Sequence, residues 1–277
     1  MCVCVWISVL GSFLFLPSPI FAYYTNMNAS VVIGQPDFTS STALSPNSNT
    51  LSLPGGILVA NSKLLIPDYS NNRILIFNSI PTANNASADV VIGQSSFTNN
   101  SANQGLANPA AYTLKNPNDL ATDGQKLFVI ESSNYRVLIF NSIPTSNNAS
   151  ADVVIGQTSM STAATGTTST TFSSNLTGIV FDTATKKLIV ADAGNNRVLI
   201  YNQLPTSNGA AADVVIGQPD FTSGNANQGG TTRANTLSTA FTVTVYNGKL
   251  FVDDYSNNRI LIFNSIPTTN NMMDPGN

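Results

Sequence analysis

Charged side chains are so scarce in this sequence that almost every one can be assigned a role. They make up 9% of the 277 residues, about a third of the usual share for a soluble domain. Four of the five arginines recur at steps of 63, 61 and 62 residues, and an acidic residue stands five positions before each. This spacing predicts an ion pair across a tight turn, with an asparagine hydrogen-bonding the turn's backbone. The predicted motif residues are Asp68, Asn72, Arg73, Glu131, Arg136, Asp192, Asn196, Arg197, Asp254, Asn258 and Arg259.

Most of the groups that enzymes use for acid–base or nucleophilic chemistry are missing. The sequence has no histidine and a single glutamate, and its two cysteines, Cys2 and Cys4, both lie in an apolar N-terminal stretch. No glycine-rich phosphate loop leads from a strand into a helix. We therefore predict a protein that is not an enzyme and has no catalytic residues, no cofactor and no metal.

Calcium is the one metal for which the sequence offers ligands, because calcium binds clustered carboxylates. One hypothesis is a metal-dependent propeller enzyme that uses the acids found in only one repeat. A second is a cation held by a ring of the four repeated acids, although groups repeated in this way favour structural ion pairs. The unrepeated acids are Asp119, Asp123, Asp182 and Asp253, of which Asp123 and Asp182 also suit hairpin turns.

A repeat of about 62 residues positions these side chains. VVIGQ begins at Val31, Val90, Val153 and Val214, and NSIPT-type linkers precede the last three copies. Each period carries four short segments rich in β-branched and aromatic residues, which indicate strands. The first segments are 57–60, 119–122, 178–181 and 242–246, and the second are 63–66, 126–130, 187–191 and 249–252. The third segment begins at each repeated arginine, and VVIG is the fourth.

Four antiparallel strands in a fixed period predict an all-β chain with a β-propeller of four blades. Segment 31–34 reads as a fourth strand without the three that should precede it, and no VVIGQ follows the last repeat. We expect this N-terminal strand to complete the last blade and close the ring, because closure removes open edges. The alternative is a piece of a longer propeller. The expected domain spans 23–277, with repeats of about 31–89, 90–152, 153–213 and 214–267.

Residues 1–22 are apolar, then small and proline-bearing, which predicts a secretory signal peptide. The alternative is an uncleaved anchor, although the apolar run is short for a membrane span. Cleavage would remove both cysteines and leave an exported chain without disulfides. The expected location is the periplasm, the cell surface or the medium. The net charge of −3 and the lack of a basic face argue against nucleic acid as a partner.

The segments around the four arginines, DYSNNRILIF, ESSNYRVLIF, DAGNNRVLIY and DYSNNRILIF, resemble the DxxNxRV core of the NHL repeat. The resemblance covers nearly all of 23–277. The chain is similar to the long-period, exported bacterial variety of NHL-repeat protein. It implies a propeller that acts as a binding scaffold, although a few related propellers are enzymes. The second repeat departs from the pattern at Glu131 and Tyr135.

The candidate binding surface is the rim that carries the loops after VVIGQ, because these long loops differ between copies. Tyrosine and arginine are common at binding hot spots, so we predict Tyr69, Tyr135, Tyr255 and Arg233 as its residues. The expected ligand is a protein or a glycan, and the expected state is a monomer. Two alternatives remain, a solvated rim without a ligand and a purely structural surface protein.

Overall fold

The computed structural model describes residues 26–270, so the predicted signal peptide 1–22 lies outside the described residues. All of the strands belong to a compact unit that begins at Val31. Between residues 26 and 270 the chain forms strands and short 3-10 turns but no α-helix. No helix in that range is long and apolar enough to cross a membrane. The all-β prediction is confirmed.

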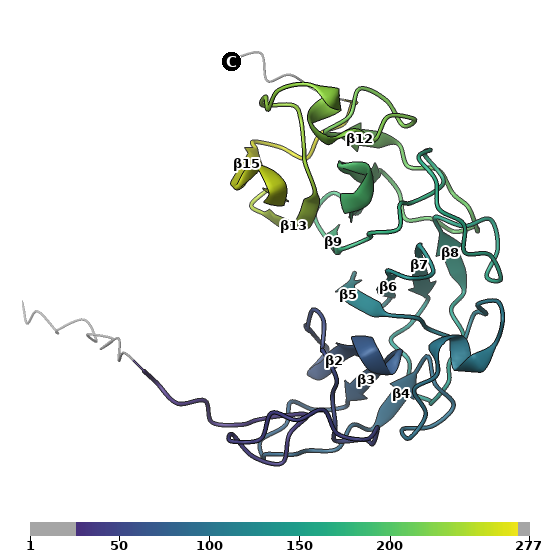
Figure 1. Ribbon diagram of the computed structural model, residues 1–277, viewed down its shortest axis with the longest axis vertical. Helices are drawn as coiled ribbons and strands as arrows, with labels where there is room; N and C mark the ends of the chain where they lie inside the picture. Colours follow the sequence, from purple (N-terminus) through teal and green to yellow (C-terminus); the bar gives the residue numbers. More distant parts are fainter. Residues whose placement is uncertain (1–25, 271–277) are drawn as a thin grey trace, which may run out of the picture. The chain divides into compact units, whose positions relative to one another are not determined.

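The strands form four antiparallel sheets in chain order (Figure 1). The first sheet contains β1 (Leu58–Ala60), β2 (Lys63–Asp68), β3 (Arg73–Phe77) and β4 (Val90–Ile92). The second contains β5 (Pro117–Thr122), β6 (Leu127–Glu131), β7 (Arg136–Phe140) and β8 (Val153–Ile155). The third contains β9 (Gly178–Asp182), β10 (Lys187–Asp192), β11 (Arg197–Tyr201) and β12 (Val214–Ile216). The last contains β13 (Ala240–Tyr246), β14 (Lys249–Asp254) and β15 (Arg259–Phe263).

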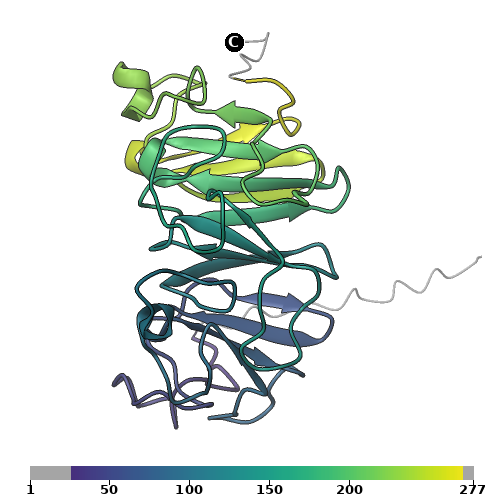
Figure 2. The same cartoon turned by 90° about the vertical axis from the view of Figure 1, so that its right-hand side faces the viewer.

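Within every sheet, strands that are neighbours in the sequence are also hydrogen-bonded neighbours, so each sheet is a simple meander. Figure 2 shows the sheets stacked in chain order, from the first in blue to the last in yellow. The repeating meander is the arrangement of a propeller blade. The fold is therefore propeller-like, as the repeat predicted.

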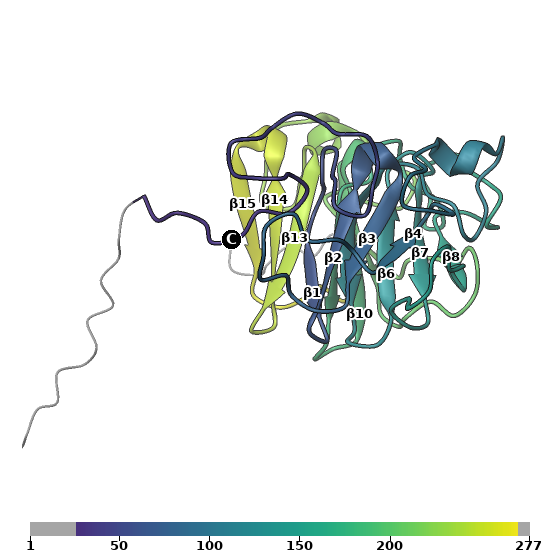
Figure 3. The ribbon, with the colours of Figure 1, turned by 90° about the horizontal axis from the view of Figure 1, so that it is seen from below.

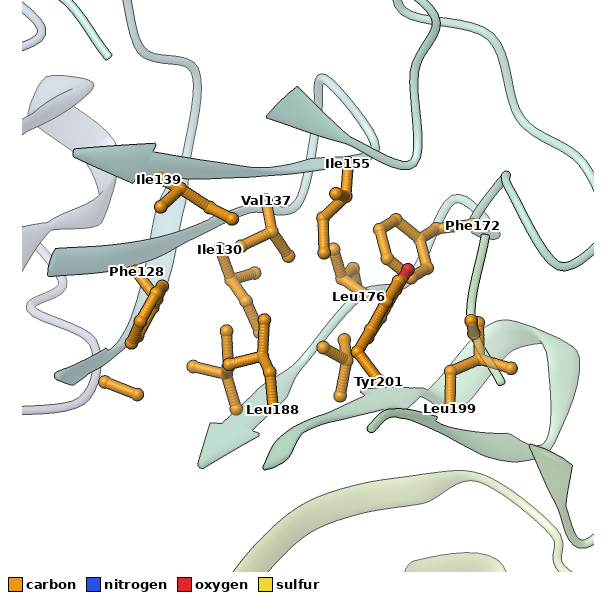
Figure 4. Close-up of a cluster of buried hydrophobic side chains, with 14 of the residues drawn as sticks. Phe128, Ile130, Val137, Ile139, Ile155, Phe172, Leu176, Leu188, Leu199 and Tyr201 are labelled. Carbon is orange, nitrogen blue, oxygen red and sulfur yellow. The ribbon is translucent and has the colours of Figure 1, made fainter. Parts of the chain in front are cut away.

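In the two middle sheets, alternate residues of the strands pack against the sheet before and the sheet after. In the cluster between the second and third sheets, Val137 and Ile139 of β7 face Leu199 and Tyr201 of β11 (Figure 4). Similar clusters join the first sheet to the second and the third to the last. Because both faces of the middle sheets are covered, their strands are apolar almost throughout rather than alternating with polar residues.

The turns between the second and third strands have a common backbone conformation. Asn72, Asn196 and Asn258 close three of them with φ of 55°, 52° and 54°. Asparagine enters this left-handed region at lower cost than most residues. Tyr135 takes the same position in the second sheet with φ 55°. The departure from the NHL pattern at Tyr135 therefore changes the side chain and keeps the left-handed backbone conformation at this position.

The predicted closure of the ring is not found in residues 26–270. The last sheet has three strands, and β15 lies at its free edge (Figure 3). Residues 31–34 form no strand. Val32 instead donates its N–H to Asn84 Oδ1 and accepts from the Asn85 N–H, both in the linker of the first sheet. These are the bonds that β4 and β8 make to the linker that follows them, so residues 31–34 lie against the first sheet as a fourth strand would, but without pairing with β15.

Candidate functional site

Each repeated arginine is the centre of a buried polar cluster that we call the loop clamp. In the third sheet, Arg197 Nε donates to Asp192 Oδ2 at 2.8 Å, and both side chains are fully buried. The remaining guanidinium nitrogens donate to the carbonyls of Phe221, Thr168 and Thr171 at 2.6, 3.0 and 2.9 Å. Phe221 follows the sheet's fourth strand, whereas the two threonines precede its first strand. One arginine therefore fixes the backbones of two different loops.

The first and second sheets repeat the clamp. Arg73 pairs with Asp68 at 2.8 Å, and Arg136 pairs with Glu131 at 2.5 Å. Burial raises the pKa of Glu131 above its usual value, and the Arg136 guanidinium limits the rise. In the last sheet Arg259 pairs with Asp254 at 2.7 Å, but its side chain is 27% exposed. Arg259 donates to two loop carbonyls, Arg233 and Thr236, and has no third carbonyl partner in the described part of the chain.

The acid of each clamp also receives hydrogen bonds from its surroundings. Asp192 Oδ1 accepts from the Ser173 N–H at 2.9 Å, and Asp192 Oδ2 accepts from Asn195 Nδ2 at 2.8 Å. The carboxylate thus holds its own turn and the loop before the first strand. The predicted ion pairs are present in all four repeats, and the asparagine that contacts the acid is the one before the predicted motif asparagine. The clamp accounts for the repeated charges as structural groups, and none of its acids is open to a ligand within the described chain.

The motif asparagines that sequence reasoning selected reach across to the next sheet. Asn72 Oδ1 accepts from the Asn116 N–H at 3.0 Å, and Asn196 Oδ1 accepts from the Thr239 N–H at 2.8 Å. Asn258 has no such partner among residues 26–270. These contacts join neighbouring sheets at the rim that carries the clamps.

Sequence reasoning missed two further anchors, although each recurs once per repeat. The glutamine of VVIGQ holds the preceding turn, because Gln94 Nε2 donates to the Asn72 carbonyl at 2.9 Å and Gln218 Nε2 donates to the Asn196 carbonyl at 2.9 Å. The linker asparagines hold the previous sheet's fourth strand. For example, Val91 N–H donates to Asn147 Oδ1 at 3.0 Å. Their exact recurrence was the available signal, but an uncharged side chain gives no hint of its partner.

The opposite rim is made by the NSIPT linkers and the hairpins between first and second strands. Lys126 Nζ donates to Asn141 Oδ1 at 2.6 Å, and Asn141 N–H donates to Asp152 Oδ2 at 2.7 Å. The same contacts recur in the other sheets, and the lysine is present in the last one. The repeated lysines and linker aspartates therefore stabilise the linkers.

The unrepeated acids do not converge. No group of three or more acidic, cysteine or histidine side chains that could hold a metal ion occurs within residues 26–270. Asp119 accepts backbone N–H bonds from Ile179 at 3.1 Å and Leu120 at 2.9 Å, and burial raises its pKa. Burial also raises the pKa of Asp253, and the neighbouring Asp254 adds to the rise.

Two of these acids serve hairpin turns, as their sequence context suggested. Asp123 Oδ1 accepts from the N–H groups of Gln125 and Lys126. Asp182 accepts from the Thr185 hydroxyl and N–H; partial burial would raise the pKa of Asp182, but these bonds bring it below its usual value.

The four candidate rim residues lie on the rim with the clamps, but no contact brings them together. Tyr69 and Tyr255 begin the 3-10 turns of the first and last sheets, whereas Tyr135 ends the turn of the second. Tyr255 packs on Phe241 with ring centroids 5.4 Å apart. Arg233 is exposed, and only its backbone takes part in a clamp.

No protein-family profile matches the chain, and no curated protein matches it in sequence. Solved structures with a similar fold include the hydrazine synthase of Kuenenia stuttgartiensis, at 10% identity over 78% of this chain and 44% of that chain, with a TM-score of 0.41. A glutaminyl cyclase of Myxococcus xanthus matches at 10% identity over 75% of this chain and 63% of that chain, with a TM-score of 0.41. The computationally designed Ika4 protein matches at 5% identity over 82% of this chain and all of its own, with a TM-score of 0.40.

The chain spans only 44% and 63% of the two natural proteins. Likenesses of this degree carry no argument about activity, so the description of the fold rests on the sheets themselves. The resemblance to the NHL repeat stays a prediction from the motif.

Proposed function

We propose that this chain is an exported, non-catalytic binding or scaffold module that presents its clamped rim to a protein or a glycan. The observation that carries the proposal is the loop clamp. Buried guanidinium groups fix the backbones of long loops whose sequences differ between repeats. A rigid support under variable loops is how binding surfaces are commonly built.

The composition of the rim suits recognition of polar partners. The loops after the fourth strands contain mainly serine, threonine, asparagine and glycine, which supply hydrogen-bonding groups, and the rim tyrosines add flat apolar surface. The metal-dependent enzyme is the second candidate, and its support is limited to Asp119 and Asp253, whose raised pKa values are of a kind that occurs at functional sites. Export is part of the proposal and is supported by the apolar stretch 1–22 alone.

A binding screen tests this function. The purified chain is applied to a glycan array and to a panel of extracellular protein domains. Any binder is then measured against four rim variants and one matched control, Lys126→Ala, on the opposite rim. The rim variants are Tyr69→Ala, Tyr135→Ala, Tyr255→Ala and Arg233→Ala.

We expect at least one rim variant to weaken binding about tenfold or more, as substitutions at binding hot spots do, and the control to bind as the parent does. A binder that is lost equally in the control would place the site elsewhere. Screens without any binder would favour the structural surface protein.

A further inference from the structure

The packing of the sheets leaves two surfaces uncovered, one at each end of the series. On β15, Ile260 and Ile262 are each 58% exposed. The matching side chains of the other sheets are buried against the sheet that follows. These side chains are Ile74, Ile76, Val137, Ile139, Val198 and Ile200. The last sheet therefore carries a forward face that is made for a following sheet.

The first sheet carries the opposite surface. Ile57 is 72% exposed, whereas the matching residues Leu120 and Ile179 are buried by the sheet that precedes them. Val59 and Leu53 are exposed beside it. A largely apolar cleft of about 490 Å³ lies between residues 33–35 and 51–54. In the second sheet the turn of the first sheet fills this position, because Asn72 contacts both Gln94 and Asn116.

The last sheet has a hydrogen-bond donor without its usual acceptor, and the segment before the first sheet has the corresponding acceptor. The clamps of Arg73, Arg136 and Arg197 each use a carbonyl 24 residues later. That carbonyl lies seven residues after the first valine of the next VVIGQ. Arg259 has no such partner among residues 26–270, and Phe38 lies seven residues after Val31. Phe38 therefore offers the carbonyl that the fourth clamp is missing.

The backbone conformation of Leu53 independently indicates that the first sheet is shaped to contact a preceding sheet. Its φ is 50°, in the left-handed region that leucine adopts at a cost in free energy. The matching residues Asn116 and Thr239 have φ of 51° and 58°, and their N–H groups donate to the motif asparagine of the preceding sheet. Leu53 is thus held in the conformation that would donate to Asn258, the motif asparagine whose side chain has no such partner in the described part of the chain.

We propose that two copies of this chain associate head to tail, with residues 31–33 of each copy completing the last sheet of the other. The register follows that of β3 with β4, in which Ile74, Leu75 and Ile76 face Ile92, Val91 and Val90. It places Ile260 opposite Ile33, and Ile262 opposite Val31. The closed assembly has eight sheets, which is within the usual range for propellers, and leaves no open edge.

A second copy fits better than the chain's own segment. Val32 is hydrogen-bonded to the first sheet through Asn84 and Asn85, as Val91 is to Asn147 and Asn148, and Val91 pairs with β3 at the same time, so residues 31–33 can pair with a β15 strand and keep these bonds. No hydrophobic cluster of the described residues joins the first sheet to the last. Closing the ring within one chain would require the three packed interfaces between sheets to change. A second copy completes the same contacts with those interfaces intact.

A cysteine cross-link separates the two arrangements. Starting from the chain with Cys2→Ser and Cys4→Ser, one batch carries Val31→Cys and another carries Ile262→Cys. Directly opposed residues of an antiparallel pair are close enough for oxidation to join them. We expect the mixture of the two batches to form a covalent species of twice 29.2 kDa, and neither batch alone to do so.

A double variant carries both Val31→Cys and Ile262→Cys in one chain. If the mixture stays at one chain's mass while this double variant closes an internal disulfide, the chain completes its own ring and the proposal is wrong. A mixture and a double variant that both remain uncross-linked would also overturn it, because they would show that residues 31–33 do not pair with β15.

Sedimentation measures the same association without cysteines. The parent chain is expected at twice its mass, and Ile262→Lys at the mass of one chain. Leu106→Lys is the matched control, because Leu106 is an exposed leucine in the loop after β4 and belongs to neither surface. A parent at the mass of one chain, or an equal loss in both variants, would refute the proposal.

A substitution of Asp253 is expected to strengthen the association rather than weaken it. It lies on the forward face of the last sheet, where the second and third sheets have Ile130 and Ala191. Association would bury its carboxylate away from water, which opposes assembly. Asp253→Ala should therefore lower the concentration at which the two copies separate, and a weaker assembly in this variant would contradict the proposed interface.

Discussion

Replacing Arg197 by methionine should destabilise the fold by about 3–5 kcal/mol, the usual cost of removing one partner from a buried ion pair. Asp192 would keep its charge in a fully buried position, with only neutral hydrogen-bond donors left around it. Three loop carbonyls would lose their donors at the same time. The loss thus combines a stranded charge with the release of two loops.

The same change at Arg259 should cost less, and the structure gives the size of the difference. Arg259 makes one carbonyl bond fewer than Arg197, and a hydrogen bond to a charged group contributes about 1.5–3 kcal/mol. Its side chain is 27% exposed, so the ion pair of Arg259 lies nearer to water than that of Arg197, although Asp254 itself is fully buried. Arg259→Met is therefore expected to be milder than Arg197→Met by about 1.5–3 kcal/mol.

Urea unfolding followed by far-ultraviolet circular dichroism measures both variants, at a protein concentration low enough to keep the chains separate. The double variant Asp192→Leu with Arg197→Met is the third sample. Because it removes the stranded carboxylate, we expect it to be more stable than Arg197→Met alone. Equal losses at Arg197 and Arg259, or a double variant that is less stable than the single one, would refute the clamp as described.

Three further predictions use single sites. The pKa of Asp119 is raised from 3.8 in the folded chain, so the stability linked to its proton is present below that pH and is lost as the pH rises through the folded pKa. Between pH 3.5 and 7 the parent should therefore lose stability relative to Asp119→Asn. A constant gap between the urea midpoints of the two proteins would contradict this. The buried Tyr201 hydroxyl has no hydrogen-bond partner in the described chain, so Tyr201→Phe should stabilise the fold by about 1–3 kcal/mol in the same assay, and a destabilised variant would reveal a partner. Millimolar calcium should leave the melting temperature unchanged, whereas a saturable rise would reveal a cation site and favour the enzyme hypothesis.

The sequence was sufficient for the sheets because each repeat carries its own local signals. β-Branched runs end at turns, and the Asp-x-x-Asn-x-Arg spacing places an ion pair across each turn, as Asp68 and Arg73 show. The pairing of neighbouring strands is local, so it follows from chain order. The clamp's carbonyl partners could not be predicted, since a carbonyl belongs to every residue and leaves no mark in the sequence.

Closure and the rim depend on geometry that no repeat encodes. Whether segment 31–34 reaches β15 depends on the angle between successive sheets, and that angle arises from side-chain packing across three interfaces. The sequence grouped Tyr69 with Tyr135 because both were expected on the rim of the variable loops and tyrosine is common at binding hot spots. In the structure one begins a turn and the other ends it. A shift of three residues within a tight turn is enough to point two side chains in different directions.

The linker asparagines have a consequence for how the chain is made. Val91 in the first sheet is bound by Asn147, 56 residues later, and Val154 is bound by Asn208, 54 residues later. During synthesis from the N-terminus, each sheet therefore lacks this bond at its outer strand until most of another repeat has emerged. Maturation lags translation by one repeat, and a ribosome that stalls within a linker leaves the preceding sheet as the exposed, protease-sensitive end of the nascent chain.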